Sequence, residues 1–128
     1  MEQKVLVRAV AERTTLSREE SADVTRAVLE GLADQLSVGE ASRLAADLPG
    51  ALAAQVQLPR RRRMGAHPVG VDDFVRQLSE HAGLSEEEAR TGAGAVLAAL
   101  REALSEEDYQ HLVGQLPAGY TDLEAAVG

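Results

Sequence analysis

The fold of this chain is decided by LSREE at residues 16–20, which recurs 68 positions later as LSEEE at residues 84–88. In each copy a serine is followed three residues later by a glutamate, the pattern of a capping box at a helix N-terminus. Apolar residues at helical spacing come next, at Val24, Val28 and Leu32 in the first copy. The stretch therefore predicts a long helix that starts at the same point in two related segments.

The similarity extends along most of the chain. A shift of 68 positions aligns the two halves without a gap, including Leu48-Pro49 with Leu116-Pro117. Roughly a third of about 47 aligned positions are identical, mostly apolar and capping residues. Because these positions set helix boundaries and packing, we expect Val5–Leu58 and Asp73–Val127 to fold alike.

Each copy is predicted to form three helices and a short fourth, and no segment alternates with the period of a strand. The fold class is therefore all-α, a helical bundle made of two tandem pseudo-symmetric repeats of three to four helices. We expect repeat 1 at residues 1–58, a linker at 59–70 and repeat 2 at 71–128, packed as one compact body. The predicted helices are 3–13, from 17, from 37 and 51–56 in the first repeat, and 71–82, from 85, from 105 and 120–127 in the second.

The composition favours a soluble cytoplasmic protein. Of the 128 residues, 45% are apolar but only 2% are aromatic, so the core must consist of leucine, valine and alanine. The absence of cysteine excludes disulfides, thiolate chemistry and cysteine zinc sites. The N-terminal residues do not resemble a signal peptide, and no apolar run is long enough for a membrane span. The excess of arginine over lysine, with abundant alanine and glycine, is typical of a bacterial chain.

The linker carries a run of four arginines, Arg60, Arg61, Arg62 and Arg63, between two acidic repeats. Residues 1–58 have six basic and nine acidic side chains, and residues 64–128 have three and twelve, so the formal net charge is −8. One interpretation is a solvated linker. A second is binding of nucleic acid or another anionic partner, which the net charge of −12 outside the run opposes. A third is docking of the run on the acidic second repeat or an acidic partner.

No motif indicates catalysis, a cofactor or a metal. His67, His81 and His111 include no pair at the i, i+4 spacing that a helical metal site requires. The acidic clusters at 86–88 and 106–108 lie in first turns of predicted helices, where the helix dipole favours them. The serines at 17, 37, 85 and 105 are explained as caps. We therefore expect a protein that is not an enzyme, with no catalytic, cofactor or metal residues.

Four residues of the second repeat depart from the first. Gly92 and Gly94 interrupt a predicted helix, and the two interpretations are tolerated strain and close packing against a neighbouring helix, for which the equivalent helix of the other repeat is one candidate. Packing is the preferred interpretation. Tyr109 and Tyr120 replace Ala41 and Leu52. A tyrosine suits a partner surface, but it also suits a site between helices, which is the preferred interpretation here.

The sequence resembles a known bacterial family in four segments: RTTLSREE at residues 13–20, TRAVL at 25–29, LSVGEA at 36–41 and LAADLP at 44–49. The family is the uncharacterised domain of unknown function 2267 (DUF2267), and the resemblance covers nearly the whole chain. It implies a helical, duplicated protein and supplies no activity or site residues. The glycines at 92 and 94 depart from the pattern, and the arginine run at 60–63 is particular to this chain.

The leading functional prediction is a non-enzymatic protein–protein interaction or scaffold module, which binds another protein or a second copy of itself. The candidate contact residues are Arg60, Arg61, Arg62, Arg63, Tyr109 and Tyr120. One alternative is binding of nucleic acid through the arginine run, and another is a small-molecule binder with a pocket between the repeats.

Overall fold

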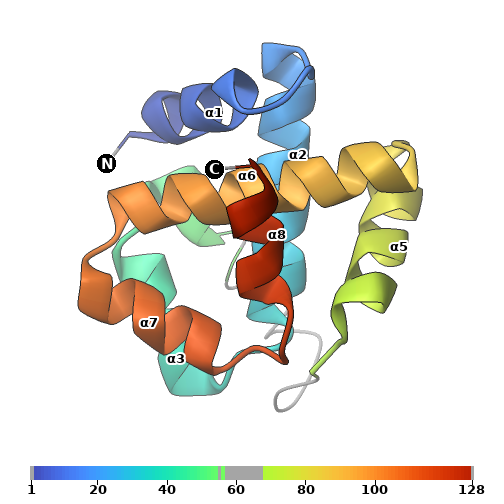
Figure 1. The fold of residues 1–128 in the computed structure, drawn as a ribbon. Helices are drawn as coiled ribbons and strands as arrows, with labels where there is room; N and C mark the ends of the chain where they lie inside the picture. The colour runs from blue at the N-terminus through green and yellow to red at the C-terminus, as the bar shows by residue number, and fades with distance from the viewer. Residues whose placement is uncertain (1, 55, 57–67, 128) are drawn as a thin grey trace.

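The computed structural model describes residues 2–54, 56 and 68–127, and all regular secondary structure in these residues is helical (Figure 1). The all-α prediction is confirmed. Residues 59–67 of the predicted linker lie outside the described residues. The helices are α1 (Gln3–Glu12), α2 (Arg18–Ala33), α3 (Val38–Ala46), α5 (Val71–Ala82), α6 (Glu86–Ala103), α7 (Glu106–Gly114) and α8 (Tyr120–Val127), and residues 50–54 are also helical.

The two long helices begin at the predicted capping boxes. The Ser17 hydroxyl accepts a hydrogen bond from the Glu20 amide at 3.0 Å, and the Ser17 amide donates to the Glu20 carboxylate at 2.9 Å. Ser85 and Glu88 make the same two bonds, each 3.0 Å long. These bonds satisfy amides that have no partner within the helix, and they explain why α2 and α6 start where the sequence predicts.

The next two helices begin at simpler caps. Ser37 accepts a hydrogen bond from the Glu40 amide at 3.3 Å, and Ser105 accepts one from the Asp108 amide at 3.1 Å. Among the described residues, neither start has the return bond that completes a capping box. The predicted helix starts are therefore correct, but a serine side chain alone supports them.

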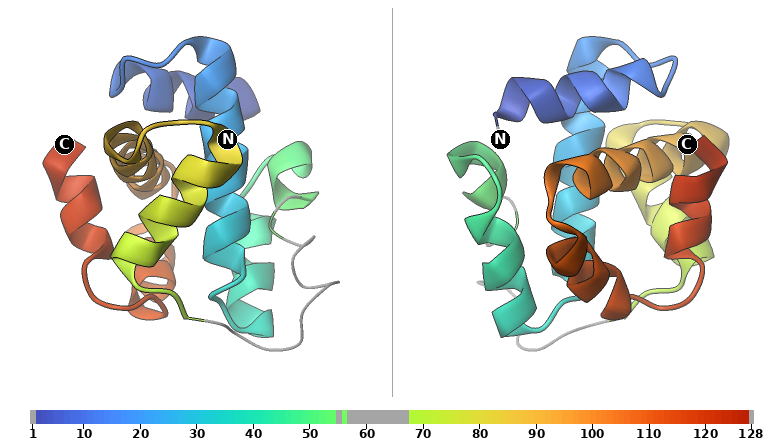
Figure 2. Two further views of the ribbon diagram at one scale, coloured as in Figure 1. Left: turned by 90° about the vertical axis from the view of Figure 1, so that its right-hand side faces the viewer. Right: turned by 60° about the vertical axis from the view of Figure 1, so that its left-hand side comes forward.

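Helix α6 lies at the centre of the molecule. It packs against α1, α2, α5, α7 and α8, and Figure 2 shows it between α8 on one side and α2 on the other, with α1 above. Nine consecutive residues, Gly92 to Leu100, are buried. A helix that is buried on all sides must be apolar all round, and this stretch contains only glycine, alanine, valine and leucine.

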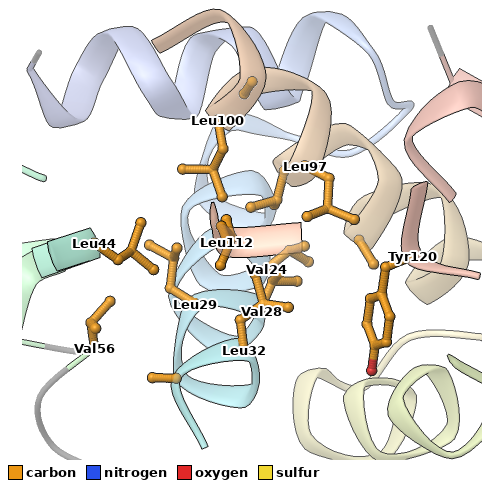
Figure 3. Packing of buried hydrophobic residues seen from close by; sticks show 14 of the residues in the cluster. Val24, Val28, Leu29, Leu32, Leu44, Val56, Leu97, Leu100, Leu112 and Tyr120 are labelled. Atoms are coloured by element: carbon orange, nitrogen blue, oxygen red, sulfur yellow. The ribbon is translucent and has the colours of Figure 1, made fainter. Parts of the chain in front are cut away.

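One hydrophobic cluster contains residues from both repeats. Figure 3 shows aliphatic side chains from α2, α6 and α7 between Leu44 of α3 on one side and Tyr120 of α8 on the other. Helix α1 packs against α2 and also against α6 of the other repeat, while α5 packs against α6 and also against α2. The two repeats therefore bury their apolar faces against each other.

The two unusual glycines of α6 lie where neighbouring helices approach closely. A Cβ atom on Gly92 would lie 2.9 Å from Cγ1 of Val24 in α2, and one on Gly94 would lie 2.2 Å from the carbonyl oxygen of Leu123 in α8. This confirms the packing interpretation of both glycines. The neighbour of Gly92 is α2, which starts 68 residues before α6, whereas the neighbour of Gly94 is α8.

A search of the described residues for a helix with the length and apolar character needed to cross a bilayer finds none.

Candidate functional site

An open groove of about 580 Å³ lies where the two repeats meet above α6, and we call it the α6 groove. One wall is the connection between α1 and α2, and the other is the first part of α6. The capping box at Ser85 fixes the start of α6 and thereby the position of the second wall. The lining residues are Glu12, Arg13, Thr14, Thr15, Leu16, Glu87, Glu88, Thr91 and Val127.

Several polar groups of the α6 groove are engaged within the protein. Arg13 forms an ion pair with Glu102 at 2.8 Å, and it also donates a hydrogen bond to the Ala9 carbonyl at 2.9 Å. The Thr14 hydroxyl donates to the Val10 carbonyl at 3.2 Å. These bonds hold the α1–α2 connection in a defined shape, so the wall that it forms is preorganised.

The remaining charge of the α6 groove is negative. Glu12 and Glu87 are exposed and form no ion pair within the described residues, while Glu88 is held in the capping box. The only cation of the lining, Arg13, is neutralised by Glu102. Unpaired carboxylates beside threonine hydroxyls suit a cationic, hydrogen-bonding ligand and disfavour an anionic one.

A second charged cluster joins α3 to α7. The Arg43 guanidinium lies 3.1 Å from the Asp108 carboxylate, and His111 Nδ1 lies 3.8 Å from Glu40 Oε1. The carboxyl groups of Asp47 and Asp108 are also hydrogen-bonded, which raises the pKa of Asp47 and lowers that of Asp108. The crevice beside them has a volume of about 10 Å³, which is room for no more than one water, so the cluster joins helices instead of holding a ligand.

Tyr120 is buried, with 1% of its surface exposed. Its hydroxyl donates a hydrogen bond to the Val69 carbonyl at 2.7 Å and accepts one from the Gln35 amide at 2.8 Å. The Val69 amide donates to the Gln35 side-chain oxygen at 2.9 Å, which closes the network. Burial raises the pKa of Tyr120 to about 12. The residue thus ties the end of α2, the approach to α5 and the start of α8 together.

Tyr109 is also buried, again with 1% of its surface exposed. The Arg101 guanidinium lies 5.5 Å from the centre of its ring and forms a 2.7 Å ion pair with Glu124. The Tyr109 hydroxyl lies 3.4 Å from the same Glu124 carboxylate. Burial, followed by the charge of Glu124, raises the pKa of Tyr109 to about 12. Both tyrosines therefore pack between helices, and in this conformation neither offers a surface to a partner.

The family model for an uncharacterized conserved protein, DUF2267, matches residues 3–123 of this sequence. The chain belongs to DUF2267. The match covers both repeats and includes every helix from α1 to α7, so the resemblance stated on sequence grounds is confirmed. No curated protein matches the chain. The chemistry of this DUF2267 member has to be inferred from its own residues.

The other candidate residues of the DUF2267 chain are distributed as follows. Arg60, Arg61, Arg62, Arg63 and His67 lie outside the described residues. His81 is exposed, with its Nδ1 atom 2.7 Å from the Gln77 carbonyl of its own helix. In the part of the chain that the structure describes, no three histidine or acidic side chains are placed to hold a metal ion.

Gln35 and the α6 groove were not identified from the sequence. Gln35 has only 1% of its surface exposed, and its counterpart 68 positions later is the exposed Ala103. A lone amide directly before Leu36, at a position where the other repeat has alanine, was a signal that could have identified it. The α6 groove brings together residues about 75 positions apart, so no local pattern indicates it.

Proposed function

We propose that this DUF2267 protein is a non-enzymatic interaction module that takes a basic, polar segment of a partner protein in the α6 groove. The observation that carries the proposal is the pair of exposed carboxylates, Glu12 and Glu87, on opposite walls of a groove formed by both repeats. A lysine or arginine between the two walls would be attracted by carboxylates on both sides. Such attraction increases the rate of association and selects against acidic partners.

The roles of the polar side chains support binding over catalysis. A nucleophilic serine needs an activating base beside it. The four capping serines instead accept hydrogen bonds from backbone amides at helix starts. Tyr109 and Tyr120 are held neutral in the interior, because burial raises the pKa of each to about 12. The absence of cysteine suits a reducing compartment and supports a cytoplasmic site of action.

We also propose that the two repeats are pseudo-symmetric copies of one helical unit. Three pairs of helices support this, because α1 and α5, α2 and α6, and α3 and α7 each start 68 residues apart. Superposition of the two repeats in an experimental structure tests the proposal.

The interaction proposal is tested by affinity capture from the native host with a matched pair of variants. The groove variant carries Glu12→Lys and Glu87→Lys. The control carries Glu80→Lys and Glu19→Lys, which are the counterparts 68 positions away and lie outside the groove. We expect the wild-type protein and the control to retain a partner that the groove variant loses. An identical set of partners for all three proteins would contradict the proposal.

A second candidate function is binding of a small cationic molecule in the same groove. Its volume of about 580 Å³ favours this, because ligand pockets typically measure about 300–1,000 Å³. Thermal unfolding with spermidine distinguishes the two candidates. A polyamine-dependent increase in Tm that the groove variant abolishes would favour the small molecule over a protein segment.

The four arginines at residues 60–63 support a third candidate, binding of a nucleic acid. Contacts with several phosphates would weaken steeply as salt concentration rises. We would expect a gel shift at about 50 mM salt that is lost when the four arginines are replaced by serine. No shift at that salt concentration would exclude this candidate.

A further inference from the structure

A valine and a glycine that occupy corresponding positions meet where the two long helices cross. Val24 lies in α2 and Gly92 lies 68 positions later in α6. Cγ1 of Val24 fills the space beside Gly92, 2.9 Å from where a glycine Cβ would be. A residue can meet its own counterpart only near a two-fold axis, because only there do equivalent positions coincide. A pair of large side chains at this crossing would collide, whereas one valine and one glycine fit.

The polar contacts between α3 and α7 are reciprocal. Arg43 forms an ion pair with Asp108, and His111 Nδ1 lies 3.8 Å from Glu40 Oε1. Adding 68 to residue 40 gives 108, and adding 68 to residue 43 gives 111. Residues 40 and 108 are thus equivalent acids, and residues 43 and 111 are equivalent basic residues. The acid of each helix faces the basic residue of the other helix. In a two-fold interface residue i contacts j while j contacts i, and these two contacts follow that rule.

Helices α1 and α5 also make reciprocal contacts with the long helices. Helix α1 packs against α6 of the second repeat, and its counterpart α5 packs against α2 of the first repeat. Both long helices also pack against the first helix of their own repeat. The packing of α1 on α6 thus has a partner contact in the other direction, the packing of α5 on α2.

We propose that the two repeats associate as an internal dimer about a pseudo-two-fold axis through the α2–α6 crossing and the α3–α7 pair. This interface holds the repeats together without the segment between residues 56 and 68. The partner that fits the exposed α2–α3 surface of an isolated first repeat is the second repeat, from the same chain or from another copy. The inference rests on the pseudo-symmetric units proposed above and does not depend on the α6 groove.

The first test cuts the full-length chain. A protease recognition sequence is inserted between Arg63 and Met64, and the folded protein is cleaved and checked on a denaturing gel. We expect the cut protein to elute as one particle of unchanged size and to keep its helical circular dichroism at micromolar concentration. Separation of the fragments under these conditions would overturn the proposal.

The second test measures how strongly the cut repeats hold together. Arg43→Glu places an acid beside Asp108 and Asp47, so the dissociation constant of the cut protein should rise about two- to tenfold. The combination Arg43→Glu and Asp108→Arg should recover most of that loss. Arg76→Glu is the control, because Arg76 pairs with Asp73 inside α5 and not across the interface. An equal effect of Arg43→Glu and Arg76→Glu would argue against the reciprocal contacts.

The third test examines the axis separately, in the uncut chain. Gly92→Val alone overpacks the crossing, and Val24→Gly alone leaves a cavity, so each should lower Tm by about 5–10 °C. The exchanged pair, Val24→Gly with Gly92→Val, keeps one valine and one glycine at the crossing and should recover more than half of the loss. Additive losses in the exchanged protein would refute the axis, even if the cut protein stays together. Neither result depends on partner capture by the groove.

Discussion

Helices α2 and α6 start with the same capping box, but they differ in how closely another helix approaches their backbone. In α6 the position two residues after Gly92 is Gly94, and the Leu123 carbonyl lies within 2.2 Å of where its Cβ would be. The corresponding residue of α2 is Arg26, which is partly exposed and pairs with Asp23 on its own helix. The same register therefore leads to backbone contact in one repeat and to a solvated side chain in the other.

The difference shows that the capping residues determine where each helix starts, whereas residues further along the helix reflect its tertiary packing. The serine and glutamate of each box determine where the helix begins, because their bonds are local. The size of the side chains further along the helix, at positions 26 and 94, depends on how close the neighbouring helix is. Glycine is needed at position 94 because α8 presses its backbone against α6 there, at a cost of about 1 kcal/mol of helix propensity relative to alanine. The following substitutions test this comparison.

Gly94→Ala should have the largest effect. The new methyl group meets a backbone carbonyl, which cannot move without displacing α8, so we expect a loss of about 3 kcal/mol in the free energy of unfolding. Urea denaturation measures this change. The matched control is Arg26→Ala at the corresponding position of α2, where only a surface ion pair is lost and the change should stay within about 0.5 kcal/mol. Equal losses at the two positions would contradict the difference between the helices.

Gln35→Ala should have the next largest effect. It removes the partner of the partly buried Val69 amide and one of the two partners of the buried Tyr120 hydroxyl. Leaving buried polar groups unpaired costs about 2 kcal/mol. Ala103→Gln is the control in the other repeat, because Ala103 is exposed, and urea denaturation should detect almost no change. A loss below about 0.5 kcal/mol for Gln35→Ala would show that the network does not stabilise the fold.

The sequence predicts the helix starts well because caps depend on residues only three positions apart, as at Ser17 and Ser85. It predicts close packing at Gly94 but not which helix packs there. It does not predict the bond between Gln35 and Tyr120, which joins residues 85 positions apart. For the same reason the α6 groove, which needs both repeats in place, was not found. The location of candidate sites thus depended on tertiary contacts that local patterns do not encode.

Gly31→Ala tests whether equivalent contacts in the two repeats are filled by side chains of different size. A Cβ on Gly31 of α2 would lie 2.7 Å from the Phe74 ring of α5. The residues that correspond to Gly31 and Phe74 are Ala99 and Leu6. Alanine is larger than glycine and leucine is smaller than phenylalanine, so a larger residue on the long helix is accompanied by a smaller partner. The overpacking is partly offset by the better helix propensity of alanine, and we expect a net loss of about 1 kcal/mol.

A double-mutant cycle makes this test specific. In a Phe74→Leu background, the Gly31→Ala change should cost nothing or should stabilise, because the leucine leaves room for the methyl group. The free energies of unfolding of the four proteins are measured in urea. The same cost in both backgrounds would mean that the ring of Phe74 is not the group that requires glycine.

The smallest effect concerns the two tyrosines, which replace Ala41 and Leu52 and make the second repeat sensitive to alkaline pH. Burial raises the pKa of Tyr109 and of Tyr120 from 10.0 to about 12, so each phenol stays neutral in the folded protein while it ionises in the unfolded chain. Their stabilising contribution is therefore complete below pH 10 and is lost as the pH rises from 10 toward 12. At pH 10 the unfolded tyrosines are half ionised, which lowers the free energy of unfolding by about 0.4 kcal/mol for each residue.

Urea midpoints at pH 8 and pH 10 measure the loss, and a variant with Tyr109→Phe and Tyr120→Phe should lose less stability over the same interval. If both proteins lose the same amount, the alkaline sensitivity comes from other groups, and the two repeats do not differ in this respect.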